Sequence, residues 1–212
     1  MKLNTYWRSS AAYRVRIALH VKGLTFETLS KKLGKGEHLT AEYAALNPQA
    51  LVPALEDAGQ VLAQSLAIIE YLDETRPQPP LLPTDPIGRA TVRAMALAIA
   101  CDIHPLNNLR VLNYLRSPLG LDEAGVTTWY RHWIATGFKA LEALAGRHSR
   151  DRRHLFGDRL SLADICLVPQ VYNARRYELD LSPYPTLVAI SAALEQLPAF
   201  AAARPEAQPD AA

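Results

Sequence analysis

A cluster of prolines divides this chain into two regions that differ in hydrophobic periodicity. The cluster consists of Pro77-Gln78-Pro79-Pro80 followed by Pro83 and Pro86. Proline lacks a backbone donor and fixes φ, so this stretch interrupts any regular element and is typical of an ordered linker. Short strand-like and helix-like segments alternate before it, whereas only helical spacing follows it. The sequence therefore predicts an α/β domain over 1–82 and an all-α domain over 87–212.

The first region alternates strands and helices in the order βαβ and then αββα. The turn residues Glu56-Asp57-Ala58-Gly59 separate two of the strands and favour a hairpin. This order predicts a small mixed sheet covered by helices. We expect strands over Lys2–Trp7, Thr25–Leu29, Pro53–Leu55 and Gln60–Leu62, and helices over Ala11–Lys22, Thr40–Leu46 and Ser65–Thr75.

The second region predicts four helices, over 87–116, 122–145, 161–177 and 184–197. Pro105 lies inside the first of them and predicts a kink or break near Asp102. Such a bend either fits the helix around a neighbour or exposes polar side chains to a ligand. The second interpretation is favoured by the polar neighbours Asp102, His104, Asn107, Asn108 and Arg110. The Ala/Pro-rich segment 201–212 is expected to fray at its end.

Composition and charge exclude several classes of protein. The 212 residues are 49% hydrophobic, which suffices for a core, and the net charge of +2 gives no reason to expect nucleic acid or a membrane as partner. Cys101 and Cys166 lie in apolar helical stretches, so we expect no disulfide framework and no metal site. No apolar run approaches the ~20 residues that span a bilayer, and we expect a cytoplasmic protein.

Two serines, Ser9 and Ser10, lie where the first predicted strand turns into a helix. A helix N-terminus presents unpaired N–H groups and partial positive charge, so hydroxyls there suit an anion such as a thiolate. A free thiol titrates near ~8.5, and a hydroxyl donor favours its ionised form. The alternative is that the serines only cap the helix, and one hydroxyl can fill both roles.

The order of the motifs resembles the zeta class of glutathione S-transferases, which includes maleylacetoacetate and maleylpyruvate isomerases. The resemblance implies an α/β thioredoxin-like N-terminal domain that binds glutathione, plus an all-α C-terminal domain that binds the substrate. It rests on Ser9-Ser10 with Arg14-Val15-Arg16-Ile17-Ala18-Leu19, on Leu51-Val52-Pro53-Ala54-Leu55, on Gln64-Ser65, and on later matches at 101–105, 107–110, 160–164, 167–171 and 180–185.

The resemblance implies glutathione as cofactor and assigns its contacts. Catalytic roles fall to Ser9 first, Ser10 second, and to Arg8 beside them. Val52-Pro53 matches a cis-proline edge, although a strand-initiating proline is the alternative. The full set of implied glutathione contacts is Ser9, Ser10, His38, Val52, Pro53, Gln64, Ser65, Asp102, His104 and Asn108.

Two positions depart from the family pattern. Ala11 and Ala12 replace a cysteine and a serine that are typical of the class. Side activities that depend on a protein thiol are therefore not expected, and Ser9 and Ser10 are the only hydroxyls at this turn.

Three arginines, Arg8, Arg110 and Arg176, are predicted to hold substrate carboxylates, since guanidinium groups make paired hydrogen bonds to such anions. Each alone is most simply a surface arginine, and the argument depends on their placement in the motifs. In having an arginine at position 110, the chain resembles maleylpyruvate isomerases more than typical maleylacetoacetate isomerases. By contrast, Ser161-Leu162-Ala163-Asp164 is interpreted as a structural capping box.

The resemblance predicts a glutathione-dependent cis–trans isomerase that converts a maleyl keto-dicarboxylate to its fumaryl isomer. One alternative is a general glutathione transferase that conjugates or dehalogenates small acids. The other is a non-catalytic module of the same fold that binds a ligand. The expected partners are a small dicarboxylate and a second copy of the chain, and the sequence leaves open which maleyl compound is the substrate.

Overall fold

The computed structural model describes residues 1–211, which divide into two compact units. The first unit combines Met1–Pro80 with the segment that begins at Gln196, and the second is Leu81–Glu195. The predicted ranges, 1–82 and 87–212, differ from this division mainly at the C-terminus. Within the described residues, no helix is long and apolar enough to cross a membrane.

The first unit contains a four-stranded mixed sheet in the order β2-β1-β3-β4. Strand β1 is parallel to β2 and antiparallel to β3, and β3 pairs antiparallel with β4 through the predicted hairpin. This is the predicted thioredoxin-like arrangement. The strands are β1 Lys2–Thr5, β2 Glu27–Ser30, β3 Ala54–Asp57 and β4 Gln60–Ala63, and the helices are α1 Ser10–Val21, α2 Ala41–Leu46 and α3 Ser65–Thr75.

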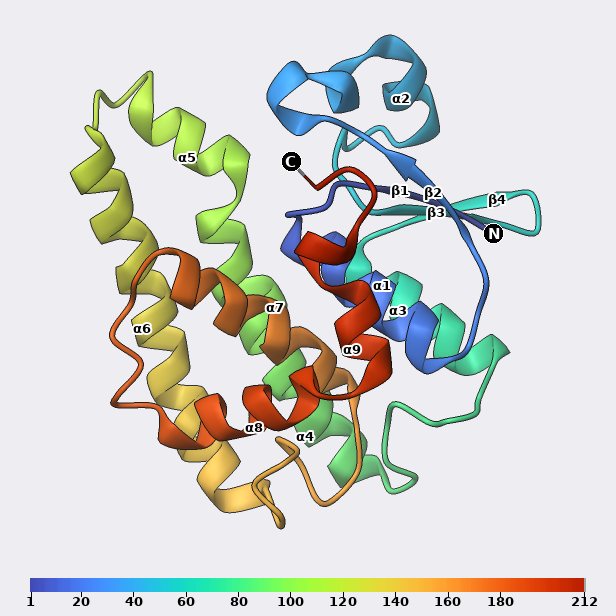
Figure 1. The fold of residues 1–212 in the computed structure, drawn as a ribbon, viewed down its shortest axis with the longest axis vertical. Helices are drawn as coiled ribbons and strands as arrows, with labels where there is room; N and C mark the ends of the chain where they lie inside the picture. The colour runs from blue at the N-terminus through green and yellow to red at the C-terminus, as the bar shows by residue number, and fades with distance from the viewer. Residues whose placement is uncertain (212) are drawn as a thin grey trace. The chain divides into compact units, whose positions relative to one another are not determined.

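Helices α1 and α3 pack side by side on one face of the sheet, and α2 lies on the other (Figure 1). Leu3 and Leu55 of the strands and Ile17, Ile69 and Leu72 of the helices are buried between these layers. Because α1 follows β1 directly, its N-terminus lies at the carboxyl edge of β1, a usual position for ligand sites in α/β sheets.

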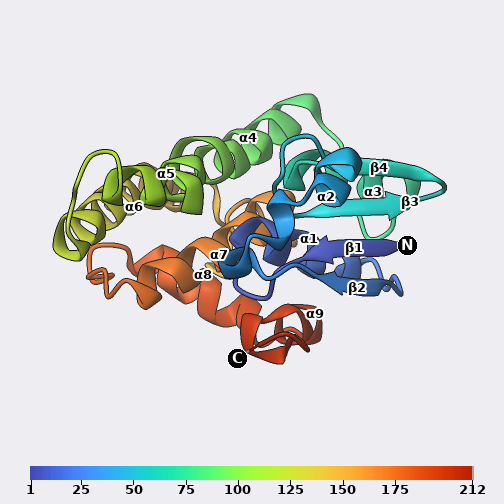
Figure 2. The same ribbon diagram turned by 90° about the horizontal axis from the view of Figure 1, so that it is seen from above.

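The C-terminal segment folds onto the first unit. Helix α9, Pro198–Ala203, packs against α1 in both ribbon views (Figures 1 and 2). Arg16 donates a hydrogen bond to the carbonyl of Ala203, and Trp7 donates one to Asp210. These contacts hold the segment as far as Asp210, short of the end that is expected to fray. Ala212 lies outside the described residues.

The second unit is all-helical, as predicted. Helix α7 is buried along nearly its whole length and packs against α4, α6 and α8. Its neighbours supply the core residues Val92, Met95, Phe138 and Ile190. The helices are α4 Pro86–Leu97, α5 Leu109–Arg116, α6 Glu123–His148, α7 Leu162–Arg176 and α8 Pro185–Glu195.

The predicted break near Asp102 is confirmed. Helix α4 ends at Leu97 and is followed by a π-helical segment, Ala98–Ile103. A 3-10 turn, His104–Asn107, then leads into α5. Pro105 lies in this turn, where its missing N–H is tolerated because the α-helical ladder has already ended.

Candidate active site

Ser9 caps α1 with its side chain. The residue has extended backbone, and its Oγ accepts a hydrogen bond from the Ala12 N–H at 3.3 Å. The capping interpretation is therefore confirmed. A hydroxyl that accepts through its oxygen still carries an O–H donor. That O–H has no acceptor within the described residues, so Ser9 can cap the helix and donate to an anion together.

Ser10 is the first residue of α1 and is buried, with 8% of its surface exposed. It lies one position inside the helix, where backbone N–H groups have no intrahelical partner. Ser9 is thus the more accessible of the two hydroxyls at this N-terminus.

Gln64 and Ser65 begin α3. The N-cap is Gln64 and not Ser65, which is the first helical residue. Gln64 has φ +70°, a conformation that is uncommon for a residue with a Cβ and that occurs at ligand sites. Its side-chain amide donates to Oε1 of Gln49 at 2.8 Å, so Gln49 extends the polar group at this helix start.

Arg14 links the two helix N-termini and was missed by the sequence reasoning. It lies on α1 and is buried, and its Nη1 donates to the Ser65 Oγ at 3.4 Å. A buried guanidinium beside the start of α3 adds positive charge where a carboxylate would bind. The signal was present in Tyr13-Arg14-Val15-Arg16-Ile17, where two cations interrupt an otherwise apolar stretch of the helix.

The Val52–Pro53 peptide bond is cis, as the resemblance implied. The preceding carbonyl, of Leu51, accepts hydrogen bonds from the Tyr43 hydroxyl and the Asn47 amide, each at 2.8 Å. The amide and carbonyl of Val52 make no hydrogen bond to any other described residue. They form a short extended edge that can pair with the backbone of a peptide ligand.

Arg8 is exposed, and His38 is half-buried. The Arg8 guanidinium lies 5.0 Å from the centre of the Trp7 ring and is exposed. Burial lowers the pKa of His38, so its ring is neutral near pH 7. His38 Nδ1 is buried without a partner among residues 1–211. Within residues 1–211, no hydrogen bond joins Arg8 or His38 to another predicted site residue.

In the second unit, Asn108 and Arg110 meet at the start of α5. The Asn108 side chain caps the helix by accepting from the Arg110 N–H at 3.1 Å. Asp102 is exposed on the π-helical segment, and His104 begins the 3-10 turn after it. Asn107 is buried and donates to the Tyr130 carbonyl at 3.2 Å, which fixes this turn against α6.

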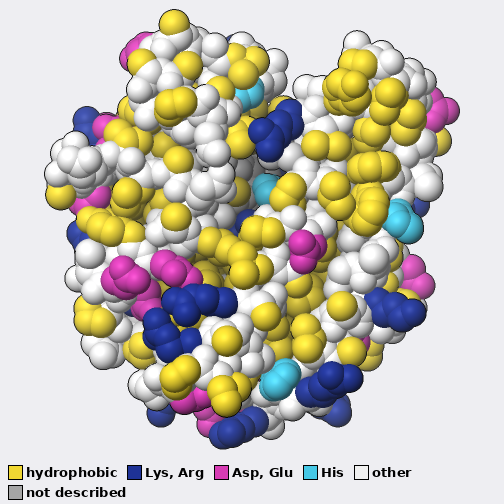
Figure 3. All heavy atoms as spheres, turned by 180° about the vertical axis from the view of Figure 1, so that it is seen from behind, with side chains coloured by type: hydrophobic (Ala, Val, Ile, Leu, Met, Phe, Trp, Pro, Cys, Tyr) yellow, Lys and Arg dark blue, Asp and Glu magenta, His cyan; other side chains and the backbone are white. Residues whose placement is uncertain are grey.

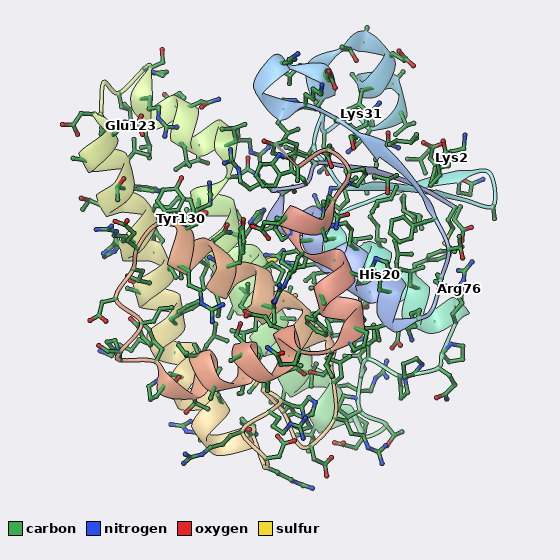
Figure 4. The ribbon with its side chains drawn as sticks, in the orientation of Figure 1. Lys2, His20, Lys31, Arg76, Glu123 and Tyr130 are labelled. Atoms are coloured by element: carbon green, nitrogen blue, oxygen red, sulfur yellow. The ribbon has the colours of Figure 1, made fainter. Side chains whose placement is uncertain are left out.

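Arg176 is the last residue of α7 and lies against two tyrosines. Its guanidinium is 4.7 Å from the Tyr177 ring centre, and the Tyr177 ring stacks on Tyr130 at 3.5 Å between ring centres. Tyr130 belongs to α6 (Figure 4). Burial raises the pKa of Tyr130 to about 12, although the Arg176 charge opposes this rise. Tyr130 therefore stays neutral, and Arg176 beside it is exposed.

Two domains of the glutathione S-transferase family match this chain. Residues 1–74 match the N-terminal domain and residues 127–202 the C-terminal domain. A maleylpyruvate isomerase from a Ralstonia species is 53% identical over the full length of each chain. A probable maleylacetoacetate isomerase from Vibrio cholerae is 56% identical, with 97% of this chain and 96% of that protein covered.

Solved structures agree with these relatives. The holo structure of a maleylpyruvate isomerase, described as a bacterial zeta-class glutathione S-transferase, superposes with a TM-score of 0.98 over all of both chains, at 53% identity. A maleylacetoacetate isomerase from Methylobacterium extorquens AM1 with bound malonate and glutathione gives 0.96 over all of both chains, at 40% identity. The chain belongs to the glutathione S-transferase family, in the zeta class of maleylpyruvate and maleylacetoacetate isomerases.

Proposed function

We propose that this protein is a glutathione-dependent cis–trans isomerase that converts a maleyl keto-dicarboxylate to its fumaryl isomer. The observation that carries the proposal is the Ser9 hydroxyl, which caps α1 and keeps a free donor at that helix N-terminus. The relatives named above support the reaction, since the maleylpyruvate isomerases among them match this chain end to end.

The residues present fit glutathione. The N-terminus of α3, with Ser65 and the buried Arg14 beside it, suits the γ-glutamyl carboxylate. The Val52 edge suits the peptide groups of the tripeptide, and Ser9 suits its sulfur. When bound, glutathione supplies a thiolate that adds reversibly to the activated double bond and so permits rotation.

Ser9 keeps that sulfur ionised. A hydrogen bond to a charged acceptor contributes roughly 1.5–3 kcal/mol, which corresponds to one or two pKa units for the thiol. The partial positive charge at the start of α1 acts in the same direction. Both effects favour the thiolate near neutral pH.

Arginines fix the diacid. We assign Arg8, Arg110 and Arg176 to its carboxylates, because guanidinium pairs hold planar anions in a defined orientation. A substrate gripped at its carboxylates stays bound while its central bond turns, which separates an isomerase from a general conjugating enzyme. The glutathione contacts assigned to His38, Asp102, His104 and Asn108 remain predictions.

Basic and acidic side chains are interspersed over the face drawn in Figure 3, and neither sign covers it. Such a surface favours a small ligand held by local charges over a polyanion that needs a continuous basic surface. We therefore propose a small dicarboxylate as the partner. The cytoplasmic location expected from the sequence is a separate proposal.

The test supplies maleylpyruvate and, separately, maleylacetoacetate with a small amount of glutathione. We expect the fumaryl product to form over many turnovers while total glutathione stays constant. Stoichiometric loss of glutathione would favour the transferase alternative. Binding of glutathione in calorimetry with no product from either compound would favour the non-catalytic module. The ratio of the two kcat/KM values assigns the preferred substrate.

A further inference from the structure

Two side chains from outside the loop hold the Tyr6–Ser9 segment. Both backbone groups of Trp7 are engaged, because its carbonyl accepts from Arg16 Nη2 at 2.8 Å and its N–H donates to Asp210 Oδ2 at 3.1 Å. The Tyr6 carbonyl accepts from the Ser9 N–H at 3.0 Å and from Arg16 Nη1 at 3.3 Å. The backbone position of Ser9 therefore depends on both Arg16 and Asp210.

Arg16 is a fully buried junction between this loop and the C-terminal segment. Besides Tyr6 and Trp7, it donates to Thr5 Oγ1 and to the Ala203 carbonyl, each at 3.1 Å. Burial lowers the pKa of Arg16 to about 10, and the charge of Asp210 opposes this lowering. The guanidinium thus remains charged near pH 7 and has Asp210 as a nearby counter-charge.

The tail itself is ordered around Asp210. The Gln208 side-chain amide donates to the carbonyls of Ala202 and Arg204, at 3.0 and 2.8 Å. The Ala211 N–H donates back to the Gln208 carbonyl at 3.0 Å. These bonds form a turn that presents the Asp210 carboxylate to the Trp7 N–H.

The second carboxylate oxygen of Asp210 is left without a partner. Its Oδ1 is buried and has no hydrogen-bond partner within the described residues. An unsatisfied buried carboxylate oxygen is unfavourable, and a neutral side chain could accept from Trp7 with less penalty. A carboxylate in this position gains by its charge, beside Arg16 and next to the loop that carries Ser9.

We infer that Asp210 and Arg16 are positioning residues, and that the C-terminal segment sets the Tyr6–Ser9 loop so that the Ser9 hydroxyl points at the glutathione sulfur. This inference rests on the proposed function of Ser9. It gives the last residues of the chain a role in the active site of the first unit.

The test compares Asp210→Ala and Asp210→Asn with the full-length wild type and with Glu74→Ala. Glu74 is an exposed carboxylate of the same unit that has no hydrogen bond or ion pair among the described residues. We expect Asp210→Ala to lower kcat/KM by about tenfold and to raise the thiol pKa of bound glutathione, because a misplaced catalytic group costs up to a hundredfold. Asp210→Asn keeps an acceptor for Trp7 but loses the charge beside Arg16, so its kcat/KM should lie between those of Asp210→Ala and the wild type. Glu74→Ala should match the wild type.

A double-mutant cycle with Ser9→Gly separates positioning from general weakening of the fold. If Asp210 acts through Ser9, Asp210→Ala costs nothing further once the Ser9 hydroxyl is gone. An equal loss on both backgrounds, or no loss in the presence of Ser9, would overturn the inference.

A second readout does not depend on isomerase activity. Hydrogen exchange of a peptide that covers Tyr6–Ser9, measured without glutathione, should speed up in Asp210→Ala and not in Glu74→Ala. If the wild type turns over neither maleyl compound, the proposed function fails. Hydrogen exchange of the Tyr6–Ser9 peptide and the affinity for glutathione still test whether Asp210 positions the loop. Unchanged exchange in Asp210→Ala would overturn the inference in either case.

Discussion

At the scale of single residues, Ser9 combines two roles in one hydroxyl. Its oxygen accepts from Ala12 and its O–H remains a donor. An alanine at this position would remove both functions together, since loss of a cap costs about 0.5–2 kcal/mol of stability. Glycine keeps most of the capping preference and removes only the donor, so it separates the two roles.

We predict that Ser9→Gly lowers kcat/KM by about tenfold to a hundredfold, which corresponds to the loss of one charge-assisted hydrogen bond. The acid limb of the pH–rate profile should move to higher pH, because the thiol of bound glutathione becomes harder to ionise. Asp122→Gly, at the N-cap of α6, is the matched capping control. Equal activity of Ser9→Gly and wild type would remove Ser9 from the mechanism.

Arg175 and Arg176 are neighbours with different surroundings. Arg175 pairs with Glu195 at 2.7 Å, whereas Arg176 lies on Tyr177 beside Tyr130. We predict that Arg176→Ala raises the KM for the dicarboxylate by about tenfold and leaves the KM for glutathione within about twofold, because one carboxylate loses its partner. Steady-state kinetics with Arg175→Ala as control test this. A parallel rise of both KM values would contradict it.

At the scale of elements, the π-helical segment after α4 requires a glycine on α6. A Cβ at Gly137 would overlap the side chain of Ile103, which ends that segment. We predict that Gly137→Ala lowers the free energy of unfolding by about 1–3 kcal/mol through overpacking. Gly146→Ala on the same helix meets no atom within 4 Å and should instead stabilise by about 0.5–1 kcal/mol. Denaturant unfolding of both variants measures the contrast.

Helix α7 begins with a buried carboxylate. Asp164 accepts from the N–H groups of Leu155 and Ser161 and from the Ser161 hydroxyl, which confirms the predicted capping box. Burial raises the pKa of Asp164 to about 6 against these three donors. The folded protein therefore takes up a proton at higher pH than the unfolded chain, where an aspartate titrates near ~3.9.

The sign of the pH dependence follows from this difference. The stability that Asp164 contributes is full below the unfolded pKa and is lost as the pH rises through about 6. From pH 7 to pH 5, the wild type should gain about 1 kcal/mol relative to Asp164→Asn, which does not titrate. Urea unfolding at the two pH values measures this gain. Parallel profiles for the two proteins would show that Asp164 has an ordinary pKa.

At the scale of the whole molecule, we propose a homodimer, and exposed apolar residues on α4 are candidates for its interface. Ile87 is 80% exposed and Leu97 is 44% exposed. They lie near opposite ends of α4, and large apolar side chains left exposed along one helix can mark an interface. We predict that the chain sediments at twice its 23.4 kDa mass and that Ile87→Lys shifts it toward monomer. Leu119→Lys, at a residue that is 56% exposed between α5 and α6, should leave the mass unchanged. A wild-type monomer would refute the dimer.

The sequence by itself determined the order of the elements and the points where the helices begin or break. Helix α3 has the predicted bounds, Ser65–Thr75, and the break after α4 falls where Pro105 requires it. The serines at the start of α1 were found in the same way. These features follow from periodicity, capping and proline chemistry, which act over a few neighbouring residues.

Only the tertiary structure decided which distant segments complete the site. Asp210 meets Trp7 across 203 positions of the chain, and Arg16 meets Ala203 across 187. No local pattern marks such a contact, so the sequence predicted nothing for the tail except fraying at its end, although Asp210 bonds Trp7. The burial of Arg14 beside Ser65 was missed for the same reason. A cation on an apolar helix face is explained only when its partner is known, and long-range packing supplies that partner.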